Sequence, residues 1–281
     1  MSHTIGEESN VREFTFTDKD FQRIRKTLFE YAGITLSDYK KDMVYNRLVR
    51  RLRALKLNNF TAYFALLDET PAEFSQFINA LTTNLTSFFR ENHHFEYLKQ
   101  TLLPDLEQQG STRIRIWSAG CSVGEESYSV AMSCIASGID LRRIDLKILA
   151  TDIDSTVLAT AKAGVYGLER IQSIPESYIK KYVDMDMGIN KAAHMGQALK
   201  KMITFKELNL MQDWPMKGPM DVIFCRNVMI YFDKDTQQML LNRMADLLTP
   251  NGLLIVGHSE TPFRLTDRFK LVGQTMYQRV Y

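Results

Sequence analysis

Cysteine is scarce in this sequence of 281 residues, and its three copies are widely separated, at positions 121, 134 and 225. A disulfide-linked domain or a zinc site needs more cysteines at closer spacing, so neither is expected. Free cysteine is usually a small buried apolar side chain, and we therefore predict that Cys121 and Cys225 pack in the core rather than act as nucleophiles. The composition favours a reducing compartment.

Long apolar runs are also missing. No stretch approaches the ~20 apolar residues that a membrane-spanning helix needs. The first 14 residues are polar and acidic, without the apolar centre of an export signal. We therefore expect a protein that works in the cytoplasm.

Several ligand-binding patterns are absent as well. The sequence has neither a G-x-G-x-x-G loop nor a Walker lysine, and it has no internal repeat. No group of residues has the spacing of a metal site: His93 and His94 are adjacent, and neighbouring residues on a helix point about 100° apart. We interpret both histidines as surface residues and expect no metal.

What remains is the composition of an ordinary globular protein, with 45% apolar and 24% charged residues and a formal net charge of +2. The length suffices for one large or two ordinary domains. The charge is unevenly distributed, because residues 40–56 hold seven basic side chains and one acidic one, a net charge of +6.

The first third of the sequence has helical periodicity. After a polar tail, helices are predicted over 18–32, 37–55, 60–67 and from 71 onward. The second helix has an apolar stripe through Val44, Leu48 and Leu52, and it carries four arginines on its other sides: Arg47, Arg50, Arg51 and Arg53. We predict a small all-α domain over residues 1–83 with a basic exposed face.

The stretch 113–129 predicts a strand that runs through a glycine loop into a helix. Gly120 and Gly124 bracket the turn, where glycine permits a positive φ and the close approach of a ligand. The acidic side chains of Glu125 and Glu126 would repel a pyrophosphate but suit an ammonium group. A second interpretation stays open, because Ser122 and Glu125 also fit a helix capping box.

From residue 113 strands and helices alternate, which indicates parallel strands with helices on both faces of a sheet. Strands are predicted over 113–118, 145–151, 203–208, 220–225 and 253–258, and residues 269–281 predict an antiparallel hairpin. A dehydrogenase repeats its βαβ half, whereas this α/β layout is that of the Rossmann-like S-adenosylmethionine-dependent methyltransferases. We predict a methyltransferase domain over 113–281. Residues 84–112 are predicted to be a linker and a connecting helix that ends before Pro104.

Ligands of such sheets bind beyond the carboxyl ends of the strands. Asp152 ends the second strand, where an acidic side chain can bind ribose hydroxyls, although Asp152 or Asp154 could instead cap the next helix. Asn227 follows the fourth strand, where its amide could contact the amino-acid part of the ligand or simply form a turn.

Four blocks make a resemblance specific: NLTSFFR at 84–90, WSAGCSVGEESYS at 117–129, ATDID at 150–154 and FCRNVMIYFD at 224–233. They resemble the signature blocks of the CheR family, the chemotaxis receptor glutamate methyltransferases. The similarity covers nearly the whole chain, including RLVRRLRAL at 47–55. It implies transfer of the methyl group of S-adenosyl-L-methionine to glutamate side chains on the cytoplasmic helical domain of chemoreceptors (methyl-accepting chemotaxis proteins).

The resemblance also implies the site residues. The cofactor and its product, S-adenosyl-L-homocysteine, would contact Asn84, Thr86, Arg90, Glu125, Asp152, Asn209, Leu210, Asn227 and Val228. Arg90 and Tyr231 are the residues that the family places at the reacting centre. The enzyme would act as a monomer, and the glutamate-rich receptor bundle matches electrostatically the predicted docking residues Arg47, Arg50, Arg51 and Arg53.

Two other functions compete with this one. A nucleic-acid methyltransferase would use the basic helix as its grip, but no asparagine precedes a proline, so the N-P-P-Y type of base-amine site is absent. A non-catalytic partner protein that binds S-adenosylmethionine would not need both Arg90 and Tyr231.

Some family members carry a small β-subdomain that docks on a tethering peptide at the receptor's C-terminus. Residues 184–204 are long enough for such a subdomain. However, Ala193-His194-Met195-Gly196 lacks the arginine-bearing strand expected to hold an acidic peptide. Peptide tethering is therefore left open.

Overall fold

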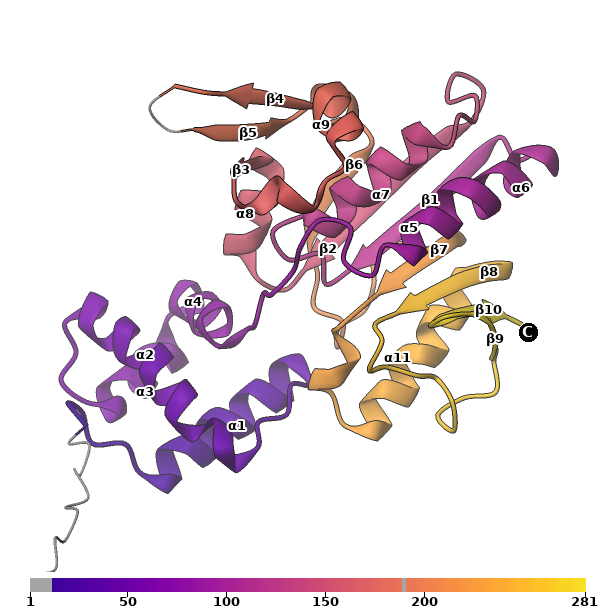
Figure 1. Ribbon diagram of the computed structural model, residues 1–281. Helices are drawn as coiled ribbons and strands as arrows, with labels where there is room; N and C mark the ends of the chain where they lie inside the picture. The colour runs from indigo at the N-terminus through magenta and orange to yellow at the C-terminus, as the bar shows by residue number, and fades with distance from the viewer. Residues whose placement is uncertain (1–11, 189–190) are drawn as a thin grey trace, which may run out of the picture. The chain divides into compact units, whose positions relative to one another are not determined.

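The computed structural model describes residues 12–188 and 191–281, which fall into two compact units (Figure 1). The first unit contains the described residues up to Tyr31 together with Thr35–Leu81. The second contains Ala32–Ile34 and Thr82–Tyr281. Residues 84–112, expected to be a linker and a connecting helix, thus belong to the second unit, and their side chains Phe88, Phe95, Leu98 and Leu103 lie in its core.

The first unit is built from helices, namely α1 (Asp18–Ala32, its last residue in the second unit), α2 (Lys41–Leu55), α3 (Phe60–Glu69) and α4 (Pro71–Leu81). Thr17 and Asp20 cap α1 reciprocally, because Asp20 N donates to Thr17 Oγ1 at 3.2 Å and Thr17 N donates to Asp20 Oδ2 at 2.8 Å. A 3₁₀ turn over Asp38–Lys40 precedes α2, so the second helix begins later than predicted. The apolar stripe of α2 is buried as expected.

The arginines of α2 do not share one exposed face. Arg51 Nε donates to Glu73 Oε1 of α4 at 3.0 Å, and the buried Tyr63 hydroxyl donates to the same oxygen at 3.1 Å. Arg47 Nη1 donates to the carbonyl oxygen of Leu81 at 2.9 Å, and Arg53 pairs with Glu13. Arg50 is exposed. The prediction of an exposed basic face is wrong for Arg51, since a buried carboxylate holds it inside the unit.

The second unit is organised by a seven-stranded sheet in the order β6-β2-β1-β7-β8-β10-β9. The strands are β1 (Arg113–Ala119), β2 (Asp145–Asp152), β6 (Ile203–Glu207), β7 (Met220–Cys225), β8 (Leu248–Val256), β9 (Phe269–Gly273) and β10 (Met276–Arg279). The first five run parallel, with Ile116 paired to both Ile148 and Val222, and β10 is antiparallel to β8 and β9. The predicted five parallel strands and closing hairpin are confirmed.

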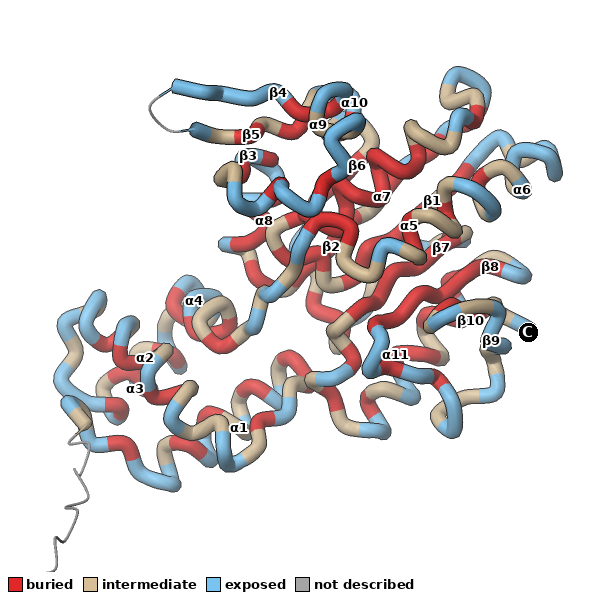
Figure 2. The backbone as a smooth tube through the Cα atoms, in the orientation of Figure 1, coloured by how far each residue is buried: buried red, intermediate tan, exposed pale blue. Residues whose placement is uncertain are grey.

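Side chains alternate along the central strands, so the core is divided between the two faces of the sheet. The central strands are buried along most of their length (Figure 2). Ile116 and Phe224 belong to the cluster that includes α7 (Glu125–Ala136). Trp117 and Ile223, one residue away in each strand, belong to the cluster that includes α11 (Lys234–Leu247). Helices on both faces bury the sheet, and polar side chains are left at the strand ends.

The helix before β1 does not end at Pro104 as predicted. It runs through α5 (His93–Tyr97), a π-helical turn over Leu98–Leu102 and α6 (Leu103–Gln108). Proline lacks an N–H and clashes with the preceding turn of a regular helix. A π-helical turn immediately before it changes that hydrogen-bond pattern, and Pro104 then occupies the first turn of α6, where no N–H is needed.

A three-stranded antiparallel sheet lies between β2 and β6 in sequence. Its order is β3 (Val165–Gly167), β5 (Ala192–Met195) and β4 (Val183–Asp186), and α8 (Ser155–Ala163), α9 (Glu176–Tyr182) and α10 (Gln197–Lys200) flank it in sequence. The sheet therefore starts earlier in the chain than residues 184–204, the range considered long enough for a small β-subdomain. Among the described residues no helix combines the length and apolarity needed to cross a bilayer.

The contacts of Glu73 generate a prediction about stability. Glu73→Ala removes the acceptor shared by Arg51 and Tyr63 and leaves the buried phenol without this partner, which costs about 1–3 kcal/mol. The unfolding transition of the helical unit, followed by scanning calorimetry, should shift to lower temperature. Glu69→Ala, which truncates an exposed carboxylate of α3, is the matched control and should melt like the parent. Equal transitions for the two variants would contradict this account.

Candidate functional site

The loop between β1 and α7 is anchored to the neighbouring strand. Gly120 N and Cys121 N both donate to the carbonyl oxygen of Thr151, at 2.8 and 2.9 Å. Gly120 has a φ of 78°, and a Cβ atom there would lie 2.4 Å from Val228 Cγ2. Glycine at this position therefore lets the loops that follow β1 and β7 touch.

The capping-box interpretation of Ser122 and Glu125 is wrong. The residue before α7 is Gly124, which has no side chain for a cap. Ser122 Oγ instead donates to the carbonyl oxygen of Asn84 at 3.1 Å, and the Glu125 carboxylate accepts from Arg170 Nε at 2.7 Å. Both side chains are thus committed to distant segments rather than to the helix start.

Asp152 and Asp154 have different partners. Asp154 caps α8, because its Oδ1 accepts from Thr156 N at 2.9 Å and from Val157 N at 3.3 Å. Asp152 accepts one backbone N–H on each oxygen, from Ser122 N at 2.7 Å and from Asp154 N at 3.0 Å. Burial raises the pKa of Asp152 to about 6. Each of its oxygens has a second lone pair, so the carboxylate retains the capacity to accept ligand hydroxyls.

The segment after the helical unit joins the same strand ends. Asn84 Nδ2 donates to Asp154 Oδ2 at 2.8 Å, and Thr82 Oγ1 donates to the same oxygen at 2.9 Å. Thr86 is half-buried two residues further on. The block at 84–90 and the block at 150–154 are therefore side by side, although about 70 residues separate them in sequence.

The adjacent residues Glu125 and Glu126 have different partners: Glu125 pairs with Arg170, and Glu126 pairs with Arg226. Glu125 is 1% exposed; its Oε1 binds Arg170, and its Oε2 is buried without a hydrogen-bond partner among the described residues. Burial raises the pKa of Glu125, and Arg170 opposes that shift. A buried carboxylate oxygen without a partner suits a ligand that brings an ammonium group.

The predicted residues after β6 and β7 lie at the same edge of the sheet. Asn209 and Leu210 follow β6 and are buried, with Asn209 Oδ1 accepting from Met211 N at 2.9 Å. Asn227 follows β7 in a left-handed conformation, with a φ of 59°. Glu260 holds this turn, since its Oε2 accepts from Asn227 N at 2.7 Å and from Gly257 N at 2.7 Å.

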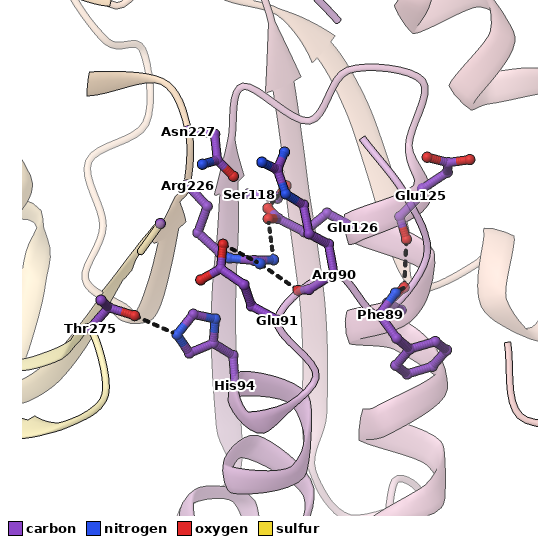
Figure 3. A network of polar contacts seen from close by, with 12 residues as sticks. Phe89, Arg90, Glu91, His94, Ser118, Glu125, Glu126, Arg226, Asn227 and Thr275 are labelled. Carbon is purple, nitrogen blue, oxygen red and sulfur yellow. Dashed lines mark hydrogen bonds and ion pairs between the residues drawn. The ribbon is translucent and has the colours of Figure 1, made fainter. Parts of the chain in front are cut away.

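Arg90 lies in a turn that a buried ion-pair network contacts (Figure 3). Its Nη1 donates to the carbonyl oxygen of Leu85 at 3.1 Å, and its own carbonyl oxygen accepts from Arg226 Nη2. Arg226 also pairs with Glu126 at 3.1 Å and with Glu91 at 3.4 Å. Tyr231, the other predicted catalytic residue, follows Arg226 in the same loop, at the end of a 3₁₀ turn over Met229–Tyr231.

The prediction that His93 and His94 are surface residues is wrong for His94. His94 is buried, and its Nε2 lies 3.2 Å from the carbonyl oxygen of Gln274 and 2.8 Å from Thr275 Oγ1. Burial, aided by Arg226, lowers the pKa of His94 to about 3, so its ring is neutral.

His94 belongs to a group of possible metal ligands. The donor atoms of Glu91, His93 and His94 lie within 4.8 Å of one another, which would suit a metal ion by spacing. The Arg226 guanidinium, 3.4 Å from Glu91, opposes a second cation there. That no metal is required stays a prediction.

Cys121 and Cys225 are packing residues, as predicted. Both are buried, and burial raises the pKa of each thiol well above its usual range. Neither side chain is therefore expected to be a thiolate near pH 7.

Sequence reasoning missed that four charged residues hold the predicted ones in place, namely Glu91, Arg170, Arg226 and Glu260. It also expected Glu126 to suit a ligand's ammonium group, whereas Glu126 pairs with Arg226. Arg226 stands next to Asn227 in a recognised block, so its position was visible in the sequence. The signal that it is buried came only from the fold, which leaves 2% of its side chain exposed.

The fold and the strand-end polar groups define a class of protein. Five parallel strands, an antiparallel strand inserted between the fifth and the last, and a glycine loop after β1 are the architecture of an S-adenosylmethionine-dependent methyltransferase. The chain belongs to the CheR methyltransferase family. The family model of the CheR methyltransferase SAM binding domain matches residues 84–278, and that of the CheR methyltransferase all-alpha domain matches residues 19–82.

Curated relatives match over almost their whole length. The chain is 45% identical over 273 residues to chemotaxis protein methyltransferase 2 of Pseudomonas aeruginosa, with 95% of each chain covered. It is 44% identical over 271 residues to the chemotaxis protein methyltransferase of Escherichia coli, covering 95% of this chain and 93% of the relative. The corresponding protein of Salmonella typhimurium is 42% identical over 271 residues, with 95% and 92% covered.

The environment of Asp152 predicts how binding depends on pH. Ligand hydroxyls that donate to the carboxylate favour its ionised form, so binding should weaken as the pH falls through about 6, where Asp152 takes up a proton. Calorimetry should show the affinity for S-adenosylhomocysteine falling between pH 8 and pH 5. Asp152→Ala should weaken binding at pH 8 by about 1–3 kcal/mol.

Asp152→Asn is the matched control, because an amide of the same size does not titrate. Its affinity should be lower than that of the parent at pH 8 and should vary less between pH 8 and pH 5. Glu125, whose pKa burial also raises, would account for any dependence that remains in this variant. A parent and an Asp152→Asn protein with the same pH profile would exclude Asp152 from the ligand.

Proposed function

We propose that the chain transfers the methyl group of S-adenosylmethionine to glutamate side chains on the cytoplasmic helical domain of chemoreceptors, giving glutamate methyl esters. The observation that carries the proposal is the match to the CheR family over both units, with relatives named chemotaxis protein methyltransferase at 42–45% identity. The enzyme would act in the cytoplasm, where that receptor domain lies, and we propose that it does so as a monomer.

The contacts at the strand ends support the proposed cofactor residues. Asp152 would accept the ribose hydroxyls, and the buried Oε2 of Glu125 would accept from the ammonium group. Asn84, Thr86, Asn209, Leu210, Asn227 and Val228 come from the segments that meet around these two carboxylates or follow neighbouring strands. Arg90 would contact the cofactor from the turn that Arg226 contacts.

The reaction requires little of the protein beyond alignment of the glutamate carboxylate with the methyl carbon. A solvated glutamate carboxyl group has a pKa of about 4.3, so it is ionised at pH 7 and needs no general base. When bound, S-adenosylmethionine supplies an electrophilic methyl carbon on a sulfonium. The carboxylate oxygen forms a bond to that carbon while the carbon–sulfur bond breaks, and the electron pair of that bond stays on sulfur as a neutral thioether. Proximity and orientation then dominate the rate enhancement.

Arg90 and Tyr231 are the residues proposed to align the carboxylate. A guanidinium can hold one or both carboxylate oxygens through its fork of N–H donors, and a phenol hydroxyl can donate one further hydrogen bond. Arg90 is half-buried, with one Nη atom engaged by the Leu85 carbonyl oxygen, so it keeps donors for a substrate.

A methyl-labelling experiment tests the function and its competitors together. The protein is incubated with methyl-labelled cofactor and either receptor membranes or RNA. Label should appear in the receptor and be released by mild base, because methyl esters hydrolyse under those conditions. Label in the RNA would support a nucleic-acid methyltransferase, and label in neither fraction would support a non-catalytic binder.

The same assay tests the two alignment residues. Arg90→Ala and Tyr231→Phe should both lower turnover, since each removes a donor assigned to the reacting carboxylate. For Tyr231→Phe, calorimetry should find an almost unchanged affinity for S-adenosylhomocysteine, because the hydroxyl is assigned to the reacting centre alone. A Tyr231→Phe enzyme with full turnover would remove that residue from the mechanism.

We propose that the receptor docks on those basic side chains of α2 that the fold leaves exposed. Arg51 is bound to Glu73. Reversing the charge of Arg51 would therefore destabilise the helical unit and could not report on docking. Arg50 is exposed, and the guanidinium of Arg53 pairs with Glu13 at the surface. Exposed pairs contribute about 0.2–1 kcal/mol each and are screened beyond about 8 Å at physiological salt.

Charge reversal of α2 supplies the docking prediction. Arg50→Glu with Arg53→Glu should raise the KM for receptor, leave the affinity for S-adenosylhomocysteine unchanged and reduce the salt dependence of methylation. The matched control is Arg142→Glu with Arg143→Glu, an equal change of charge at exposed positions of the second unit. Kinetics at two ionic strengths and a melting curve are needed for both. Equal receptor KM values for the two double variants would refute docking through α2.

A further inference from the structure

The turn that carries Arg90 is not held by local backbone preference. Phe89 and Glu91, on either side of Arg90, have φ values of 54° and 56°. Residues with a Cβ atom disfavour this left-handed region because Cβ crowds the following carbonyl. Two such residues around one arginine require contacts from elsewhere in the fold to keep the turn in place.

Those contacts come from both sides of the turn. Phe89 N donates to Ser129 Oγ of α7 at 3.0 Å, and the Phe89 ring packs on Phe95. On the other side, Arg226 Nη2 donates to the carbonyl oxygen of Arg90 and lies 3.4 Å from Glu91 Oε1. The guanidinium of Arg226 therefore contacts two consecutive residues of the turn.

Arg226 is itself fixed in the interior. Only 2% of its side chain is exposed, and its guanidinium carbon lies 5.6 Å from the centroid of the Phe95 ring. Its Nη1 pairs with Glu126 Oε2 at 3.1 Å, while Glu126 Oε1 accepts from Ser118 Oγ at 2.8 Å. Figure 3 shows this connected series from the end of β1 through α7 and the end of β7 to the turn.

We propose that Arg226 is a positioning residue for methyl transfer, which sets the main chain of Arg90 and thereby the place of its guanidinium. Arg226 itself is directed at Glu126, Glu91 and a carbonyl oxygen rather than at substrate. The inference rests on the proposed function, in which Arg90 holds the reacting carboxylate. It adds a residue whose buried charge acts only through that arginine.

Arginine is required at this position by geometry. Its planar fork directs five N–H donors in fixed directions, so one side chain can pair with two carboxylates and a carbonyl oxygen together. A lysine ammonium keeps the charge but is a point donor on a flexible stem. Arg226→Lys therefore preserves the sign of the buried charge and removes the fixed geometry.

The test is a double-mutant cycle between Arg226 and Arg90, measured as kcat for receptor methylation at saturating cofactor. Arg226→Lys should lower kcat on the order of 100-fold, the effect expected when a reacting group is misplaced by about 1 Å. The receptor KM should stay near that of the parent, because docking uses the other unit. In an Arg90→Ala background the same substitution should cause no further loss, because its effect is transmitted through Arg90.

Arg268→Lys is the matched control. Arg268 also pairs with a carboxylate, Asp246 at 2.6 Å, and donates to the backbone carbonyl oxygen of Asn242 at 3.3 Å, and neither partner belongs to the turn at Arg90. Its kcat should equal that of the parent. If Arg226→Lys does not fold, Glu126→Gln replaces it, because the amide keeps the volume and removes the charge that orients Arg226.

The outcomes separate this inference from the proposed function. Parent kcat in Arg226→Lys, or losses that multiply in the Arg226→Lys and Arg90→Ala double variant, would overturn the positioning role and leave the proposed function intact. A parent protein that does not label the receptor would overturn the proposed function, and the positioning role with it. A loss in Arg226→Lys that disappears without Arg90, beside an unaffected Arg268→Lys, supports both.

Discussion

The charge on Arg226 is buried, and the arrangement of the candidate site depends on how that charge is compensated. Two carboxylates, Glu126 and Glu91, share the guanidinium, and they come from different segments of the second unit. A buried charge that loses its partner is strongly destabilising, so the fold that satisfies this arginine must bring all three segments together. The ends of β1 and β7, the start of α7 and the turn at Arg90 are thereby placed with respect to one another.

The parallel sheet explains why the remaining polar residues gather at one edge. Parallel strands all end at the same edge of the sheet, and their apolar side chains pack against the helices on its two faces. Asp152, Asn209 and Asn227 each lie at the end of a strand or follow one at that edge. The same edge receives the segment at 84–90, which Ser122 and Asp154 bind through Asn84. A ligand-binding edge therefore results from strand direction, and its specificity results from the side chains supplied there.

In the helical unit, neighbouring basic side chains of α2 differ in whether they are bound inside the unit or exposed at its surface. Arg51 is used internally, by a carboxylate that also satisfies a buried tyrosine, whereas Arg50 is exposed. Adjacent arginines with similar sequence signals thus have different environments. The charge available for a partner is smaller than the net charge of the segment suggests, because part of it is neutralised before any partner arrives.

Periodicity and the four sequence blocks were sufficient to predict the family and the main elements of the two units, but not the three-stranded sheet that starts at β3. Periodicity located the helices of the first unit and the strands of the sheet, because apolar spacing reports directly which side chains face a core. The blocks contain all the residues proposed for the cofactor except Asn209 and Leu210, which the family resemblance implied. The folded chain was needed to show that Asp154 caps α8, that Ser122 and Glu125 form no capping box, that His94 is buried and that the helix passes through Pro104. The physical reason is distance along the chain: Glu125 finds its partner 45 residues away and Arg226 finds Glu126 100 residues away. Local patterns reach only about four residues, so they cannot choose between a nearby partner and one that the fold brings in.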